Sequence, residues 1–319
     1  MEHLLEVKNL KVSFFTELGE VQAVKDAEFY VDSGDFFGIV GESGSGKSVT
    51  TKSILRLGPD NCKVTGDEIL FEDGDILKMN ESELRNLRGR DISMVFQDSL
   101  SSLNPVYTVG NKMVELIRRR SKKSKAEARA YALELLTAVG IADAEKVMRS
   151  YPHELSGGMR QRVMIAMAMS SKPKVLIADE PTTALDVTIQ AQILHLLQNL
   201  QKSSDMSIIL ITHDLGVVAQ TCKRVAVMCG GYVVEQGSVE EIFLHPRHPY
   251  TQALIASMPK VGGRFEQFLE RDLSDNSGNL CPFLNRCKYA NAACENSLPE
   301  IRSCGAGHAI RCHRWEDFK

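Results

Sequence analysis

The chain has 319 residues, of which 43% are hydrophobic and 25% charged. It can therefore bury a sizeable core, in one large domain or about two ordinary ones. Its 38 basic and 41 acidic side chains give a formal net charge of -3, too balanced to favour nucleic acid as the default partner. No apolar run approaches the roughly 18 residues that span a bilayer. Charged residues among the first fifteen argue against a signal peptide. We therefore expect a cytosolic protein.

Two alternating segments open the chain, LLEVKNLKVSFF (4–15) and VQAVKDAEFYV (21–31), with a turn near Gly19. Alternation of apolar and polar residues predicts a pair of β-strands. The next segment, DFFGIV (35–40), is short and apolar and runs directly into a glycine-rich loop. The chain therefore begins as a sheet whose third strand leads into a possible binding loop.

That loop, GESGSGKS (41–48), fits the phosphate-binding pattern G-x-x-x-x-G-K-[ST] in full. It follows a strand and precedes a predicted helix, VTTKSILRL (49–57). The glycines let backbone N–H groups turn inward around phosphate oxygens at the start of a helix. We expect Lys47 to reach the β- and γ-phosphates and Ser48 to ligate Mg²⁺. A glycine-rich turn that binds nothing is the alternative, and the lysine and serine argue against it.

Polar residues also end three later segments. Gln97 follows the apolar run of SMVFQD and offers a neutral oxygen to magnesium or water. In KVLIADE (174–180), Asp179 closes a buried strand and supplies a second magnesium anchor, while Glu180 can polarise a water for attack on the γ-phosphate. His213 ends the next strand, SIILITH (207–213). A strand-end position favours a catalytic contact over a merely structural histidine.

Helical patterns occupy the rest of the middle of the chain. Residues 121–139 place Tyr131, Leu135 and Val139 on one face, with Leu136 beside them and charges opposite. VTIQAQILHLLQNLQ (187–201) lies between two apolar strands, which implies a right-handed crossover unit. RVAVMCGGYVVEQG (224–237) reads as a hairpin turning at a glycine pair. The pattern dissolves after about residue 260, where we place a domain boundary.

ELSGGMRQR (154–162) predicts a helix that begins with paired glycines. Ser156, Gly157 and Gly158 leave free N–H groups at the helix start, which form an anion site without Cβ atoms in the way. The stretch resembles the signature motif of ATP-binding-cassette (ABC) ATPases. In that family the signature loop covers the ATP held by a partner cassette in a head-to-tail dimer.

The resemblance covers about residues 4–260 and implies an α/β fold, a P-loop NTPase core of ABC type. It further implies an N-terminal antiparallel β subdomain and an α-helical subdomain inserted at about 98–165 that docks onto a membrane partner. A small cysteine-rich extension, 261–319, follows the nucleotide-binding domain of 1–260. ATP and Mg²⁺ are the expected cofactors.

The resemblance also assigns residues one by one. Phe14 (or Phe15) would stack on adenine, and Leu185-Asp186 would touch the partner's site. Glu180 would activate water, aligned by His213 and Gln97, and Mg²⁺ would be held by Ser48, Gln97 and Asp179. The residues expected to contact nucleotide are Phe14, Gly41, Ser43, Gly44, Ser45, Gly46, Lys47, Ser48, Val49, Ser156, Gly157, Gly158 and Asp186.

FQDSLSSLNPVYTVG (96–110) and HPRHPYTQALIASMP (245–259) are similar to segments of the ATP-binding subunits of oligopeptide/dipeptide importers. Ser99 departs from the usual proline, which changes loop stiffness and not chemistry. The similarity implies two membrane permease subunits, an extracytoplasmic solute-binding protein and a second, paralogous ATPase subunit. It also implies a peripheral place on the cytoplasmic face of the membrane. Relatives of this kind also serve nickel and oligosaccharides, so the solute stays open.

Five of the eight cysteines lie in the last 39 residues. Clustered thiols in a cytosolic protein suggest metal and not disulfides, and their wide spacings do not match structural zinc. The tail resembles an importer extension that in some members holds a 4Fe–4S cluster, here on Cys281, Cys287, Cys294 and Cys312. Zinc and vacant thiols are the alternatives. Three further residues are possible substitute ligands: Cys304, His308 and His313.

The sequence argues against two rival functions. A soluble ABC ATPase acting on DNA would carry long coiled coils between the phosphate loop and the signature, and no sustained heptads occur there. Ribosome-acting relatives usually carry two cassettes in one chain. A cassette that binds ATP without turnover would be favoured by loss of Glu180 or His213, and both are present.

Overall fold

The computed structural model describes residues 3–98, 102–258, 280–305 and 307–318. The chain divides into two compact units, Met1–Lys78 with Ile211–Lys319, and Met79–Leu210. The boundary predicted near Lys260 and the departure at Ser99 lie outside the described residues.

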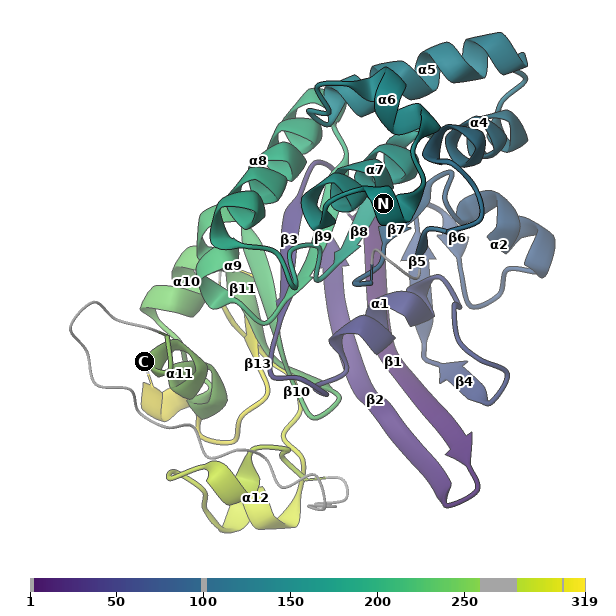
Figure 1. Cartoon of the computed structure of the whole chain (residues 1–319). Helices are drawn as coiled ribbons and strands as arrows, with labels where there is room; N and C mark the ends of the chain where they lie inside the picture. Colours follow the sequence, from purple (N-terminus) through teal and green to yellow (C-terminus); the bar gives the residue numbers. More distant parts are fainter. Residues whose placement is uncertain (1–2, 99–101, 259–279, 306, 319) are drawn as a thin grey trace. The chain divides into compact units, whose positions relative to one another are not determined.

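The first unit begins with a long antiparallel pair, β1 (Leu5–Thr16) and β2 (Gly19–Val31). This confirms the two strands expected from alternation (Figure 1). Three short strands extend the sheet beyond β1: β4 (Cys62–Thr65) and β5 (Glu68–Phe71) pair with β1, and β6 (Gly74–Asp75) pairs with β5. The antiparallel region is therefore broader than the sequence pattern alone indicated.

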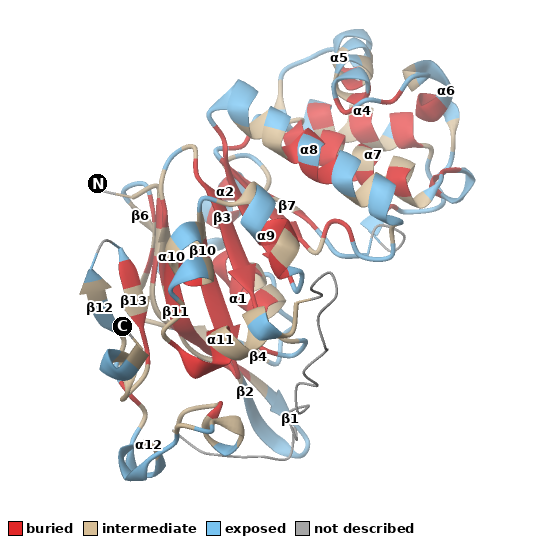
Figure 2. Ribbon diagram, turned by 90° about the vertical axis from the view of Figure 1, so that its left-hand side faces the viewer, coloured by how far each residue is buried: buried red, intermediate tan, exposed pale blue. Residues whose placement is uncertain are grey.

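The centre of this unit is a set of buried strands. β3 (Phe36–Val40) runs parallel to β10 (Arg224–Cys229), and β11 (Tyr232–Ser238) runs antiparallel to β10. Every residue of β3 is buried, as expected for a strand that is covered on both faces. Figure 2 shows that β10 and β11 are also buried along most of their length. The predicted hairpin turns at Gly230 and Gly231, both with positive φ.

Short helices join these strands. The helix after the phosphate loop, α1 (Lys47–Ile54), begins two residues earlier than predicted. Three more helices belong to the second stretch of this unit, which begins at Ile211: α9 (Leu215–Thr221), α10 (Val239–Leu244) and α11 (Pro249–Ala256). Pro249 occupies the first turn of α11, where its missing N–H costs nothing.

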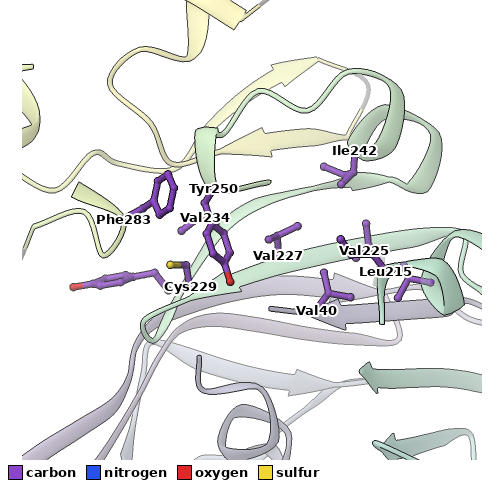
Figure 3. Close-up of a cluster of buried hydrophobic side chains, with 11 residues drawn as sticks. Val40, Leu215, Val225, Val227, Cys229, Val234, Ile242, Tyr250 and Phe283 are labelled. Atoms are coloured by element: carbon purple, nitrogen blue, oxygen red, sulfur yellow. The ribbon is translucent and has the colours of Figure 1, made fainter. Parts of the chain in front are cut away.

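The cysteine-rich segment shares the core of this unit. Its Phe283 is buried against Tyr250, with ring centroids 5.4 Å apart in an edge-on arrangement, beside Val227 and Val234 (Figure 3). The segment also contains a short helix and two short strands: α12 (Ala292–Asn296), β12 (Arg302–Gly305) and β13 (His308–Ile310). Because β13 pairs with β11, the described part of the tail extends the same sheet.

The second unit combines short strands with most of the long helices. β7 (Ile92–Val95) and β8 (Val175–Asp179) are parallel, and β9 (Ser207–Thr212), within which the division of the chain falls, lies next to β8. The α-helices among its described residues are α2 (Glu81–Leu87), α4 (Val109–Arg120), α5 (Lys125–Ala138), α6 (Ala144–Arg149), α7 (Gly157–Met169) and α8 (Val187–Ser204).

The helix predicted over 121–139 is wrong at its start. Ser124 caps α5, since its hydroxyl accepts from the N–H of Glu127 and the Glu127 carboxylate accepts from the N–H of Ser124. This capping box starts the helix at Lys125. The buried residues of α5 are Ala128, Ala132 and Leu136. Of the predicted face, Leu136 and Val139 are buried, whereas Tyr131 and Leu135 are only partly buried.

Candidate functional site

The phosphate loop of the first unit connects β3 to α1. Lys47 is only 5% exposed, and its ammonium donates to the carbonyl oxygens of Gly41 at 2.8 Å and Glu42 at 2.9 Å. These bonds curl the loop around the lysine. The side chain that should meet the β- and γ-phosphates is therefore held inside the loop that would surround them.

Close backbone approach explains Gly46 in this loop. Gly46 has φ of 103°, and a Cβ there would lie 2.9 Å from the carbonyl oxygen of Ala23. The N–H of Gly231 donates to the carbonyl of Ser45 at 3.0 Å, which ties the loop to the β10–β11 turn. Any side chain at Gly46 would push the loop off this support, so its shape depends on the hairpin beneath it.

Two residues that the sequence did not single out also contact the loop. The hydroxyl of Tyr250 accepts from the backbone N–H of Glu42 at 3.0 Å. The guanidinium of Arg286 pairs with the Glu42 carboxylate at 2.8 Å. No local sequence signal could have identified them, because Tyr250 lies 208 positions and Arg286 lies 244 positions after Glu42.

The acidic pair of the second unit lies at the end of β8. Asp179 is completely buried there. Glu180 follows with φ of 45°, a conformation that a non-glycine residue adopts only at a cost. Its carboxylate accepts from the amide of Gln97 at 2.9 Å and from the hydroxyl of Thr183 at 2.8 Å. The structure therefore brings two of the predicted catalytic residues into direct contact.

The signature stretch starts α7 as expected. Ser156 is its N-cap, and the hydroxyl accepts from the N–H of Met159 at 3.3 Å. A Cβ on Gly158 would lie 2.7 Å from Cγ2 of Ile189, and one on Gly157 would lie 3.1 Å from Leu185. The paired glycines thus have a packing role within this chain, besides the anion site inferred from the sequence.

The remaining predicted site residues lie on several different helices and strands. Asp186 caps α8 and accepts from the N–H of Ile189 at 2.9 Å. His213 follows β9 and is exposed. Phe14 is half-buried in β1, opposite Val21 of β2, whereas Phe15 is 48% exposed. Phe15 therefore offers the more accessible ring for stacking, and Phe14 the more firmly held one.

The four cysteines predicted as a cluster line one cavity of about 20 Å³ in the first unit. Burial, together with the nearby Cys287 and Cys294, raises the pKa of Cys281 to about 11. Burial and the three other thiols raise the pKa of Cys312 to about 12. Without a cation beside them these thiols stay protonated at neutral pH, and thiolates are what metals bind.

The possible substitute ligands lie elsewhere or are engaged. The thiol of Cys304 donates to the carbonyl of His308 and does not line the cavity. Nε2 of His308 lies 2.8 Å from the carboxyl of Glu235. His313 does line the cavity, with Nε2 3.0 Å from the carbonyl of Ser297. Within the described ranges, no three His, Cys, Asp or Glu side chains stand where one metal ion could bind them.

Comparison with known proteins defines the class. The family model described as ABC transporter matches residues 24–183, and the model described as Oligopeptide/dipeptide transporter, C-terminal region, matches residues 234–294. The chain belongs to the ABC transporter family and has the α/β cassette fold of its ATPases. Over the part of the chain that the structure describes, no helix is long and apolar enough to cross a membrane.

Two relatives with names from peptide transport are similar to most of this chain. The dipeptide transport ATP-binding protein DppD of Bacillus subtilis (strain 168) is 47% identical over 319 residues, 98% of this chain and 95% of that protein. The oligopeptide transport ATP-binding protein OppD of the same organism is 55% identical over 267 residues, 83% and 75% of the two chains. A dimeric cassette, MJ0796, bound to ADP and Pi has a TM-score of 0.66 at 30% identity over 74% of this chain and 98% of its own.

Proposed function

We propose that this chain is the ATP-hydrolysing subunit of an importer of oligopeptides or dipeptides. The observation that carries the proposal is the phosphate loop with Lys47 buried inside it, in a chain that also matches the C-terminal region of oligopeptide/dipeptide transporters. That second match favours a transporter over a soluble ABC ATPase acting on nucleic acid or ribosomes. It also favours peptides over nickel or an oligosaccharide.

In this proposal the loop from Gly41 to Ser48 binds the phosphates through backbone N–H groups and Lys47. Ser48, Gln97 and Asp179 offer hydroxyl, amide and carboxylate oxygens, a donor set that suits Mg²⁺. When bound, the ion would neutralise charge on the phosphates. Glu180 accepts a proton from the attacking water, Gln97 orients Glu180, and His213 aligns the water.

The first partner in this proposal is a second cassette, and the dimeric cassette MJ0796 supports pairing as such. In the proposed head-to-tail pair, Ser156, Gly157, Gly158 and Asp186 cover the partner's nucleotide. We propose a paralogous ATPase subunit as that partner. Two membrane permease subunits would contact the helical segment of about 98–165, and an extracytoplasmic binding protein would deliver the solute. The chain would then be peripheral, on the cytoplasmic face of the membrane.

We also propose a 4Fe–4S cluster on Cys281, Cys287, Cys294 and Cys312, with zinc as the alternative. The shared cavity supports it, because the same four thiols that the sequence pointed to gather there. The wide spacing of these cysteines along the sequence favours a cluster over structural zinc, whose ligands usually come in closely spaced pairs. When bound, the group would link the short segments of the tail.

Transport by whole cells tests the function. A strain lacking this chain should lose uptake of a radiolabelled tripeptide or dipeptide. The wild-type chain should restore uptake, and a Lys47→Ala variant present at the same level should not. If the strain instead keeps peptide uptake and loses nickel or oligosaccharide uptake, the peptide assignment fails.

A further inference from the structure

The phosphate loop contains one acidic residue, Glu42, in a place where negative charge opposes the ligand. A carboxylate next to bound triphosphate would repel it, with an energy that grows as the site excludes water. All three polar parts of Glu42 are engaged: its carbonyl by Lys47, its N–H by Tyr250 and its carboxylate by Arg286. The last two partners belong to segments far beyond the loop in sequence.

The pairing of Arg286 with Glu42 has the fork geometry of a strong ion pair. Nη1 lies 2.8 Å from Oε1 and Nη2 lies 3.2 Å from Oε2, with side chains 10% and 27% exposed. Such bidentate contacts fix orientation as well as charge. Burial opposes the charge of Arg286, but the bond to Glu42 outweighs it and raises the pKa of the guanidinium.

Aromatic rings hold this arginine in place. The guanidinium lies 5.0 Å from the ring centre of Phe283 and 5.8 Å from that of Tyr250. Burial raises the pKa of the Tyr250 phenol well above its usual range, so the hydroxyl stays neutral and accepts the N–H of Glu42. Figure 3 shows Phe283 beside Tyr250 in this buried cluster. These contacts hold Arg286 in position to pair with Glu42.

Arg286 belongs to the segment that carries the cavity cysteines. It lies directly before Cys287, in the 3₁₀ turn Leu284–Arg286 that follows Cys281. Both cysteines line the shared cavity. The segment that carries the cysteines therefore also carries the group that neutralises and orients the phosphate loop.

We propose that Arg286 is a positioning residue for ATP, through which the cysteine-rich segment sets the nucleotide affinity of the phosphate loop. Arg286 acts by holding Glu42 and touches no nucleotide itself. This inference rests on the proposed ATPase function. It predicts that losing the contact weakens ATP binding, because the Glu42 carboxylate is then an uncompensated negative charge in the loop that binds the phosphates.

Equilibrium titration of the full-length chain with a fluorescent ATP analogue tests the proposal. Arg286→Ala should raise the Kd on the order of tenfold, and Arg286→Lys, which keeps the charge and loses the fork, should fall between. Lys288→Ala removes an exposed cation from the same segment and should leave the Kd unchanged. A wild-type chain that binds no ATP would contradict the proposed function, whereas equal Kd values for wild type and Arg286→Ala would contradict only this inference.

A second background separates positioning from general stability. In Glu42→Gln the repelling charge is gone, so adding Arg286→Ala should change the Kd less than about twofold. If Arg286→Ala costs the same in both backgrounds, Arg286 does not act through Glu42 and the proposal is wrong. Circular dichroism melts of each variant identify any that fail to fold, and the Glu42→Gln and Arg286→Lys pair then carries the test.

Discussion

The side-chain amide of Gln97 donates to the carboxylate of Glu180 at 2.9 Å, although 83 residues separate them in the chain. Gln97 follows β7 and Glu180 follows β8, and these strands are parallel neighbours. The carboxyl ends of parallel neighbours lie at the same edge of a sheet. The contact therefore follows from strand order, and it joins the proposed general base to a residue that can orient it.

Glu180→Gln should abolish turnover and spare binding. The amide has the shape of the carboxylate but cannot take a proton from water, so kcat for ATP should fall by about 10²-fold or more. The Kd for ATP should stay within about twofold, because no ground-state contact of the nucleotide is removed. Steady-state phosphate release and nucleotide titration measure the two quantities. Glu134→Gln, at an exposed position of α5, is the matched control.

Gln97→Ala should act through Glu180. We expect kcat to fall by about tenfold with a much smaller change in KM, since a mispositioned base loses transition-state stabilisation. Because Gln97 is also a proposed Mg²⁺ ligand, the comparison is made at saturating Mg²⁺, where the double variant Gln97→Ala, Glu180→Gln should be no slower than Glu180→Gln alone. Additive losses would show that Gln97 works independently of the carboxylate, and would contradict this role.

Strands and phosphate motifs could be predicted from the sequence because their signals are local. The alternation in β1 and β2, the buried run of β3 and the loop up to Ser48 each lie within about a dozen residues. The start of α5 was missed because Ser124 prefers to cap a helix, which outweighs the apolar period that runs across it. Tyr250 and Arg286 were missed because only the fold brings them to Glu42.

The paired glycines show how two requirements can share one motif. The sequence pointed to an anion site at Ser156–Gly158, and the distances add a packing requirement against Leu185 and Ile189. No periodicity carries that second signal, because it depends on how α7 meets α8. The anion site and the packing against α8 therefore place separate requirements on the same glycines.

Gly158→Ala should destabilise the protein although alanine favours helices. A Cβ would lie 2.7 Å from Cγ2 of Ile189, and a β-branched side chain has little freedom to move away. Overpacking of this kind costs about 1–3 kcal/mol, more than the gain of up to about 1 kcal/mol in helix propensity. Thermal unfolding should show a lower Tm. Adding Ile189→Ala should reverse the part of the loss due to the clash, and if it does not, the contact is not the cause.

Glu235→Ala should loosen the C-terminal segment. Glu235 is fully buried, accepts from the N–H groups of Arg247 at 2.7 Å and His248 at 3.1 Å, and lies 2.8 Å from Nε2 of His308 in β13. Leaving these groups without a partner should cost at least about 2 kcal/mol.

Urea unfolding and limited proteolysis measure the two consequences of that change. The midpoint should fall, and cleavage should release the part of the chain that carries β13. Glu240→Ala, an exposed acid at the start of α10, should stay within about 0.5 kcal/mol of wild type. Equal proteolysis of the two variants would show that the buried carboxyl does not anchor the tail.

The cysteine cavity makes the most selective prediction. Protein purified without oxygen should contain iron and acid-labile sulfide and should absorb visible light. Substituting Ser for any one of the four cavity cysteines should remove the iron, the sulfide and the absorbance; these are Cys281, Cys287, Cys294 and Cys312. Cys304→Ser should keep all three properties, because that thiol donates a hydrogen bond to the carbonyl of His308 and does not line the cavity. Removing the metal should lower the Tm of the wild type, since a bound group links segments with few core residues of their own. Stoichiometric zinc without sulfide would contradict the cluster and favour zinc at the same cysteines. Loss of the metal in Cys304→Ser would show that Cys304 is a ligand and would contradict the proposed set of four.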